Sequence, residues 1–542
     1  MPARSIPPRP KYSMRFRASG KIWYSAEVMT VPMKIVASVV ESTPERALAL
    51  MAQADRVADG IELRLDALGM LPADDPTSVL ASAIGATEKP IILTYRPREE
   101  GGHSDVSLFD RQRFWSRVLA WTERRADARG RLFYDLEVDL AEAFRDAASP
   151  VPWDRVIVSH HHREAASPEV VEAMYARLSA LPARLLKLAI FAHDIGDSLL
   201  IFRLLERARQ QRRALVGIAM GMAGLLTRIL GVAYGSAFTY GAVVAGREAA
   251  PGQIPVSDLR ALYRVAEIGR GTAVVGVIGY PIGHSLSPLV HNVGFRTLGL
   301  NFVYVPLEVV ALDRFMRDFV RPETRRLSWP LRGLSITIPH KVAVMGFVDE
   351  VDVLARRVGA VNTLVVEGER LRGYNTDVAG GTEPLAERIT LEGAHVAIVG
   401  AGGAARALAY GVRERGARVS LFGRRLERVR VLAEAVGADA HALDELADSV
   451  CDVLINATPV GMAGYPEQEL IPDAVLRHRP LVYDLVYNPL ETPLLRRAKR
   501  MGCPVLSGVE MFLRQAAEQF RLWTGVEPPL DAMRAHVYTA LS

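Results

Sequence analysis

The feature that most constrains the fold of this chain is a recurrence of short β-branched or apolar runs with helical pattern between them. Eight such runs follow one another in the first half, starting at residues 34, 60, 90, 131, 155, 185, 215 and 237. The segments between them carry apolar residues at steps of three and four, as helices that connect parallel strands do. Eight parallel strands with eight helices predict a closed (β/α)8 barrel, with a doubly wound open sheet as the alternative.

A second α/β unit is predicted after Ile268, where the segment GRGTAVVGVIGYP starts a new buried strand. Further strands are expected in NFVYVPLEV and LSITIPH, with helices between them. The later segment HVAIVGAGGAARALAYGVRERGARVSLFGRR has the order strand, glycine turn, helix and strand. That order is typical of one half of a dinucleotide-binding Rossmann domain, so we expect a barrel followed by a two-lobed α/β unit.

Charge and composition exclude several classes of function. The 66 Lys and Arg against 61 Asp and Glu leave a net charge of +5, and the basic residues are scattered, which does not favour a nucleic-acid partner. Residues 229–246 are uncharged and long enough for a membrane span. They are dense in Gly, Ser, Thr and Tyr and lie inside the strand and helix repeat, so no membrane partner is expected.

Two features bear on the compartment. Cys451 and Cys503 offer neither a disulfide framework nor metal-ligand spacing, which favours a reducing cytoplasm. Residues 1–32 are rich in Arg and Ser and resemble a transit peptide. The alternative is a flexible basic extension that precedes a true start at Met33, and the second reading is preferred.

Polar residues gather where the predicted barrel strands end, which is where barrel enzymes place their reactive groups. They are Glu62, Arg64, Asp66, Arg96, Glu100, Asp135, Glu137, His160, His161 and His162. Lys187 lies among leucines in the sixth strand, where apolar surroundings would disfavour the ammonium form and leave an amine that attacks a carbonyl. The alternative is a structural lysine that is paired or turned to solvent. Adjacent strand side chains point to opposite faces, so the histidines are not expected to hold a metal ion together, and one of them could serve as a general base.

These residues resemble the type I 3-dehydroquinate dehydratases over residues 33–268, through ELRLD, TYR, EEGG, SHH, LLKLA, TYGA and APGQI. The resemblance implies that Lys187 forms an imine with the substrate ketone, that His161 moves the proton, and that Glu100 orients His161. It further implies residues that hold the substrate's hydroxyls and carboxylate, namely Glu62, Arg64, Arg96, Arg228 and Gln253. Met220 and Met222 would pack the lysine. Ala249 departs from the serine usual in the family, so one substrate hydrogen bond is expected to be lost or replaced.

The glycine turn after the strand HVAIV fits the G-x-G-x-x-A pattern of dinucleotide-binding domains, although an ordinary strand-to-helix turn is the alternative. The turn residues expected to hold the cofactor are Gly400, Gly402, Gly403, Ala404 and Ala405. Where an NAD-binding domain carries an acidic residue, this chain has Arg424 and Arg425. Two guanidiniums and no carboxylate favour NADP.

Four polar clusters precede the turn: HSLSP, SITIPHK, GAVNT and YNTD. Each could be only a helix cap or a turn. As a set, with INATPVGM, YDLVYNP and GVEMFLRQAA, they resemble shikimate dehydrogenases over residues 273–542. The resemblance implies that Lys341 and Asp377 form the catalytic pair, and that the substrate is bound by Ser285, Ser287, Thr337, Asn362, Tyr487 and Gln515. Ser335 stands where single-domain bacterial members commonly have Asn, and matches the fused plant-type pattern.

The product of the first resembling family is the substrate of the second, so the two halves predict consecutive steps of the shikimate pathway with NADP as cofactor. Alternatives are a second half that acts on quinate, and a degenerate fusion in which one half only scaffolds the other. The expected division is a basic extension (1–32), a dehydratase barrel (33–268), a shikimate-binding domain (273–377), an NADP-binding Rossmann domain (378–515), and C-terminal helices that close back on the substrate domain (516–542).

Overall fold

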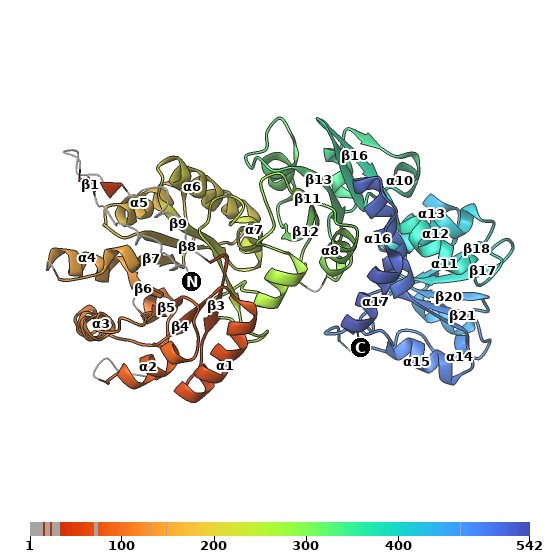
Figure 1. Ribbon diagram of the computed structural model, residues 1–542. Helices are drawn as coiled ribbons and strands as arrows, with labels where there is room; N and C mark the ends of the chain where they lie inside the picture. The colour runs from red at the N-terminus through yellow and green to blue at the C-terminus, as the bar shows by residue number, and fades with distance from the viewer. Residues whose placement is uncertain are drawn as a thin grey trace, which may run out of the picture. The chain divides into compact units, whose positions relative to one another are not determined.

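The computed structural model describes residues 15–16, 22–23, 33–69, 74–128, 130–147, 149–283, 285–466 and 468–541 (Figure 1). These residues form two compact units, with the boundary between Ile268 and Gly269. The extension expected over residues 1–32 lies outside the described residues, except for two short antiparallel strands, β1 (Arg15–Phe16) and β2 (Ile22–Trp23).

The first unit is the predicted barrel. Its strands, all paired in parallel, are β3 (Ile35–Val39), β4 (Gly60–Arg64), β5 (Ile91–Thr94), β6 (Leu132–Glu137), β7 (Val156–His162), β8 (Leu185–Phe191), β9 (Ala214–Met220) and β10 (Thr239–Ala242). The order β10-β3-β4-β5-β6-β7-β8-β9 is nearly closed, because an isolated parallel bridge joins Leu215 to Ser236. All eight predicted strands are therefore confirmed, and the open-sheet alternative is wrong.

Helices α1 to α7 alternate with these strands. They are α1 (Pro44–Val57), α2 (Thr77–Gly85), α3 (Leu108–Thr122), α4 (Val138–Asp146), α5 (Pro168–Ser179), α6 (Ser198–Gln210) and α7 (Leu225–Leu230). The expected eighth helix is replaced, among the described residues, by a five-residue π-helical segment after β10, Asp258–Leu262. The uncharged stretch 229–246 is divided between α7 and β10, and no helix of the described residues is long and apolar enough to cross a membrane.

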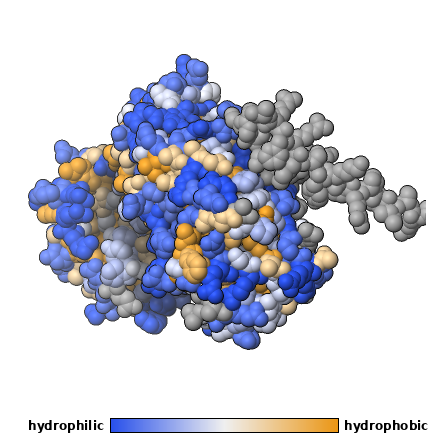
Figure 2. Space-filling view, turned by 90° about the vertical axis from the view of Figure 1, so that its left-hand side faces the viewer, coloured by the Kyte–Doolittle hydropathy of each residue, from blue (hydrophilic) through white to orange (hydrophobic). Residues whose placement is uncertain are grey.

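Local sequence explains why these elements form where they do. In α1 the Thr43 hydroxyl accepts a hydrogen bond from the Arg46 amide, and Pro44 occupies the first turn, where its missing N–H costs nothing. The strands are buried on both faces, inside by the barrel core and outside by the helices, so they read as continuous apolar runs. The face drawn in Figure 2 is mostly hydrophilic, with smaller hydrophobic groups between, as is usual for a folded chain.

The second unit contains two six-stranded sheets. The first, ordered β12-β11-β13-β15-β16-β14, comprises β11 (Ala273–Gly279), β12 (Phe302–Glu308), β13 (Leu331–Ile336), β14 (Glu350–Val351), β15 (Thr363–Glu367) and β16 (Arg370–Tyr374). The second, ordered β19-β18-β17-β20-β21-β22, comprises β17 (His395–Val399), β18 (Arg418–Gly423), β19 (Asp439–Ala442), β20 (Val453–Asn456), β21 (Leu481–Asp484) and β22 (Val505–Ser507). This parallel order, 3-2-1-4-5-6, is that of the Rossmann fold, with its reversal point between β17 and β20.

The helices of the second unit cover both sheets. They are α8 (Ser287–Thr297), α9 (Leu312–Phe315), α10 (Val353–Val358), α11 (Asp377–Ala386), α12 (Gly403–Glu414), α13 (Leu426–Val436), α14 (Asp473–Leu476), α15 (Pro493–Arg500), α16 (Gly508–Thr524) and α17 (Leu530–Leu541). The boundary expected between residues 515 and 516 falls inside α16. This single helix serves both lobes, because Met511 packs in the core of the Rossmann sheet while the Trp523 indole donates to the Leu364 carbonyl at 3.0 Å.

Candidate active sites

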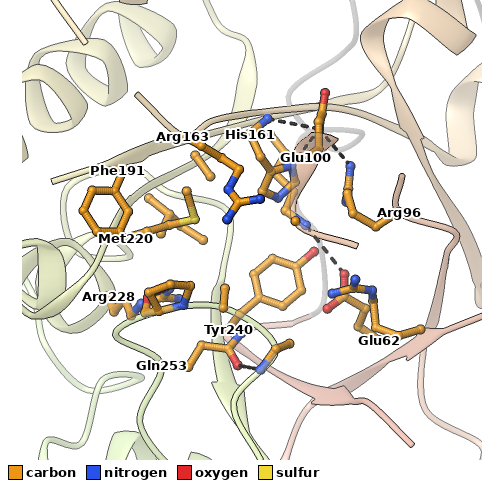
Figure 3. A pocket seen from close by; sticks show the side chains of 18 of the residues that line it. Glu62, Arg96, Glu100, His161, Arg163, Phe191, Met220, Arg228, Tyr240 and Gln253 are labelled. Carbon is orange, nitrogen blue, oxygen red and sulfur yellow. Dashed lines mark hydrogen bonds and ion pairs between the residues drawn. The ribbon is translucent and has the colours of Figure 1, made fainter. Parts of the chain in front are cut away.

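The barrel holds a cavity of about 250 Å³ at the carboxyl ends of its strands (Figure 3). The dehydratase-type residues expected from the sequence all line it, namely Glu62, Arg64, Arg96, Glu100, His161, Lys187, Arg228 and Gln253. Met220 lines it as expected, whereas Met222 is exposed and is not part of the lining.

Lys187 is buried, but its amine is not in apolar surroundings. Its Nζ donates to Asp135 Oδ2 at 2.9 Å, lies 3.6 Å from Glu62 Oε1, and sits 4.3 Å from the centre of the Tyr240 ring. The expectation of an apolar environment is therefore wrong. Side chains alternate along β8, so the adjacent Leu186 and Leu188 point to the opposite face, and Lys187 shares the inner face with charged residues from other strands.

His161 and Glu100 form a hydrogen-bonded pair. Glu100 Oε2 lies 3.0 Å from His161 Nδ1 and accepts from the His161 amide at 3.1 Å, while Oε1 lies 3.2 Å from His160 Nδ1. Burial opposes ionisation of Glu100, but hydrogen bonds from the two histidines hold its pKa well below the usual range. Because an ionised carboxylate only accepts, we infer that Nδ1 of His161 donates and that Nε2 is the free base.

Burial, followed by the charge of Arg96, lowers the pKa of His161 to about 4. The ring is therefore neutral at ordinary pH. A neutral imidazole with a fixed tautomer, in a cavity that also holds a lysine amine, has the form of a general base.

Arg96 and Arg64 line the cavity but are already paired with carboxylates. Arg96 donates to Asp135 at 2.8 Å and to Glu137 at 2.9 Å, and Arg64 makes two hydrogen bonds of 2.8 Å to Asp66. Sequence reasoning noted these three acids without giving them a role. The alternation in LFYDLE was the available signal, because it places Asp135 and Glu137 on one strand face.

Arg228 differs from both, since it has no carboxylate partner among the described residues. Its guanidinium donates to the Pro251 carbonyl at 3.1 Å, and its Nε has no partner in the part of the chain that the structure describes. Burial lowers its pKa to about 10, so it stays charged at neutral pH. A buried cation that lacks a counter-ion marks a place for an anionic group of a ligand.

Gln253 lines the same cavity and is held in place by its neighbours. Its Oε1 accepts from the Ala249 amide at 2.9 Å, and its Nε2 donates to the Ser38 hydroxyl at 3.3 Å. Ser38 in turn donates to Glu62 at 2.8 Å, a link from β3 to β4 that the sequence did not reveal.

In the second unit, Lys341 and Asp377 are in direct contact. Lys341 Nζ lies 2.5 Å from Asp377 Oδ2, and Nδ2 of the Asn362 side chain donates to Asp377 Oδ1 at 2.8 Å. The Asp377 amide donates to Asn375, which fixes the first turn of α11. Three residues from separate motifs therefore meet at one carboxylate.

Among the described residues, the other substrate residues expected from the sequence contact neighbours outside this pair. The Ser287 amide, at the start of α8, donates to the Ser285 hydroxyl at 3.3 Å, and Thr337 follows β13 directly. Tyr487 stacks on Phe512, with ring centres 4.8 Å apart, and the Gln515 amide donates to the backbone of its own helix. Within the described residues, no hydrogen bond joins the side chains of Thr337, Tyr487 or Gln515 to the Lys341–Asp377 pair.

A buried chain of hydrogen bonds leads to this pair, and two of its members were not expected. The Tyr304 hydroxyl donates to Ser335 at 2.7 Å, Ser335 donates to Gln519 at 2.8 Å, and Gln519 donates to Thr363 at 2.9 Å. Thr363 then donates to Asn362 at 2.8 Å. Ser335 thus belongs to the support of Asn362, and Gln519, one helical turn after Gln515, could have been noticed as a polar residue on the buried face of α16.

The glycine turn lies between β17 and α12. Gly400 has φ of +125°, and a Cβ there would come 2.9 Å from the Ala457 carbonyl oxygen, so glycine is required. Gly402 caps α12, and a Cβ on Gly403 would lie 3.3 Å from the Lys341 side chain. The turn therefore borders the Lys341–Asp377 pair, and its bare backbone fits the close approach of a pyrophosphate.

The other cofactor candidates flank this turn. Ala404 and Ala405 form the first turn of α12, where Ala405 is buried. Arg424 and Arg425 follow β18 and are both exposed, in the position that carries the ribose partner in this fold.

A barrel with a buried lysine and a dinucleotide fold with a lysine–carboxylate pair define a two-site enzyme, one site of lyase type and one of oxidoreductase type. The family model of the type I 3-dehydroquinases matches residues 35–270 of this chain. Three further models match the second unit: the shikimate dehydrogenase substrate binding domain (277–364), shikimate/quinate 5-dehydrogenase (384–463) and the shikimate 5'-dehydrogenase C-terminal domain (508–538). Over 530 residues the chain is 35% identical to the chloroplastic bifunctional 3-dehydroquinate dehydratase/shikimate dehydrogenase of Arabidopsis thaliana, covering 94% of this chain and 84% of that one. The chain belongs to this family of bifunctional 3-dehydroquinate dehydratase/shikimate dehydrogenases.

Other relatives match the second unit alone. The shikimate dehydrogenase (NADP(+)) of Methanothermobacter thermautotrophicus is 41% identical over 278 residues, 48% of this chain and 94% of that protein. The structure of shikimate 5-dehydrogenase from Thermus thermophilus, in complex with NADP(H) and shikimate, is 36% identical and covers 50% of this chain and 100% of that chain, with a TM-score of 0.43.

Proposed function

We propose that residues 33–268 remove water from 3-dehydroquinate, and that residues 273–542 reduce the resulting 3-dehydroshikimate to shikimate with NADPH. The observation that carries the proposal is the meeting of Lys187 with the His161–Glu100 pair in one cavity, in a chain whose second unit brings Lys341 and Asp377 to a glycine turn. Within the second unit, residues 273–377 would bind substrate, 378–515 would bind NADP, and 516–542 would close back on the substrate lobe.

In the barrel, Lys187 Nζ attacks the C3 ketone, and loss of water leaves an iminium that acidifies the C2 proton. His161 Nε2 removes this proton, and Glu100 stabilises the imidazolium that forms. The enamine then expels the C1 hydroxyl, which takes the proton back from His161 and leaves as water. A second water hydrolyses the imine, releases the enone product and restores the amine.

Substrate binding in the barrel follows from the charges of the lining. Arg228 is suited to the substrate carboxylate, because it is the buried guanidinium that no described carboxylate neutralises. The hydroxyls would be held by the residues that line the rest of the cavity, namely Glu62, Arg64, Arg96 and Gln253.

In the second unit, NADPH supplies a hydride when bound. Lys341 gives a proton to the carbonyl oxygen that becomes the new hydroxyl, and Asp377 and Asn362 hold that lysine in place. Ser285, Ser287, Thr337, Tyr487 and Gln515 would bind the substrate's carboxylate and hydroxyls. The turn from Gly400 to Ala405 would hold the pyrophosphate.

Product analysis tests the whole proposal. Purified protein is incubated with 3-dehydroquinate and NADPH, and the product is identified by chromatography and mass. Shikimate is expected. Quinate would contradict the assigned specificity, and dehydroshikimate with unused NADPH would contradict the reductase; no finding favours the quinate alternative.

The pH dependence of dehydration should reflect the lowered pKa of His161. The neutral ring is the active base, so activity is retained as pH falls below 6.5 and is lost only as pH passes through about 4. The measurement is kcat/KM for enone formation against pH, since this ratio reports the free enzyme. A circular dichroism spectrum at each pH checks that the fold persists. An acid limb near 6.5 in folded protein would contradict the assignment of His161.

Cofactor choice should depend on Arg424 and Arg425. Replacing both by alanine is expected to raise KM for NADPH by about 10- to 100-fold, because charge-assisted hydrogen bonds to the 2'-phosphate are lost. Activity with NADH should change by less than about twofold, since NADH lacks that phosphate. Arg428→Ala, which removes an exposed guanidinium from the first turn of α13, is the control. Equal losses with both cofactors would contradict the assignment.

We also propose a cytoplasmic location, with neither a nucleic acid nor a membrane as a partner. Both cysteines are free and buried, which is compatible with a reducing compartment. The name of the plant relative places that protein in the chloroplast. Fractionation of cells that express the full chain, with the two enzyme activities as markers, tests the location.

A further inference from the structure

One guanidinium in the barrel cavity has no part in the mechanism above. Arg163 comes directly after β7, lines the cavity and is exposed at its mouth. In Figure 3 its side chain points into the cavity on the side of Met220, across from Glu62. Within the described ranges, no hydrogen bond or ion pair joins Arg163 to another residue.

The other cations of the cavity fall into two groups. Arg64, Arg96 and Lys187 are each paired with carboxylates of the barrel at 2.8 to 2.9 Å. Among the described residues, the partner of Arg228 is the Pro251 carbonyl alone. Two guanidiniums, Arg163 and Arg228, therefore remain for an anionic ligand to neutralise, and Figure 3 places both on the side of Met220.

We propose that Arg163 is a second binding residue for the carboxylate of the barrel's substrate, acting together with Arg228. This inference rests on the proposed dehydration of 3-dehydroquinate, whose single anionic group is that carboxylate. Arg228 is buried, whereas Arg163 is exposed, so Arg163 attracts the anion at the mouth and then holds it with a charge-assisted hydrogen bond. It also supplies a donor on a lining where Ala249 offers no side-chain hydrogen bond.

The role predicts a change in binding without a change in chemistry. Arg163→Ala is expected to raise KM for 3-dehydroquinate about tenfold while kcat stays within about twofold, because the residue holds the substrate carboxylate, which takes no part in imine formation or proton transfer. Arg163→Lys keeps the charge and should fall between wild type and Arg163→Ala. Added salt should lower kcat/KM less steeply in Arg163→Ala than in wild type, because part of the attraction is gone.

The matched control is Arg203→Ala, which removes the same charge from an exposed position on α6 outside the cavity. It should leave KM and the salt dependence unchanged. A rise in KM shared by both variants would overturn the proposal, since it would be an effect of net charge.

Borohydride reduction with substrate, followed by intact mass, separates this proposal from the function on which it rests. Wild-type protein that forms no adduct at Lys187 would overturn the dehydratase assignment itself. If wild-type protein is active and forms the adduct, the variant Arg163→Ala tests the role of Arg163 alone. A KM within about twofold of wild type, or a loss of kcat in place of a rise in KM, would overturn that role.

Discussion

Replacing Lys187 by alanine is expected to lower kcat for dehydration by at least about 10,000-fold, because the covalent route through the imine is lost. Lys187 is the only primary amine among the described residues that line the cavity, so no neighbour can take its place. A guanidinium is not a nucleophile, so the arginines there cannot replace the amine. The measurement is the absorbance of the enone product, together with the loss of the borohydride adduct from the intact mass.

Two controls belong to this experiment. Lys34→Ala removes an exposed amine just before β3 and should leave the adduct and kcat unchanged. The reduction of dehydroshikimate by the Lys187→Ala protein should equal that of wild type, because the second site uses other residues. Retention of more than about 1% of kcat, or an adduct that still forms, would show that another group carries the reaction.

The barrel strands and the central strands of the second unit could be predicted because burial on two faces leaves a direct mark on the sequence. LLKLAIF is apolar except for Lys187, and HVAIV before the glycine turn is apolar after its first residue. The division of helices between lobes leaves no such mark. The helix α16 is one regular segment whose two ends bury their apolar faces in different cores. Nothing in the local sequence shows that one helix continues across the boundary expected after residue 515.

The environment of each reactive group was harder to predict than its position. The sequence surrounds Lys187 with leucines, but alternation along β8 sends the adjacent Leu186 and Leu188 to the other face. The contacts of Nζ come from β6 and β4, 52 and 125 residues earlier. Glu100 and His161, 61 residues apart, could be paired in advance only through resemblance to a family. Tyr304 and Gln519, which support Asn362 from two further elements, were missed because neither belongs to a motif.

Lys341→Ala should separate the second activity from the first. Reduction of the ketone needs a proton at the oxygen as the hydride arrives, and loss of the group that supplies it is expected to lower kcat by about 100- to 10,000-fold. KM for NADPH should change little, since the side chain borders the glycine turn without being one of the proposed cofactor contacts. Dehydration by the same protein should be unaffected.

Asp377→Asn tests whether Asp377 acts through Lys341. If Asp377 acts by holding Lys341, the double variant Lys341→Ala, Asp377→Asn should be hardly slower than Lys341→Ala, because the two residues work as one unit. In the oxidation of shikimate, the defect of Lys341→Ala should shrink as pH rises, since hydroxide can then remove the proton that the lysine would have accepted. NADPH fluorescence on binding checks that the second unit is folded. Independent, multiplicative losses in the double variant, or a defect that does not change with pH, would mean that Lys341 has a binding role and that the proton is moved elsewhere.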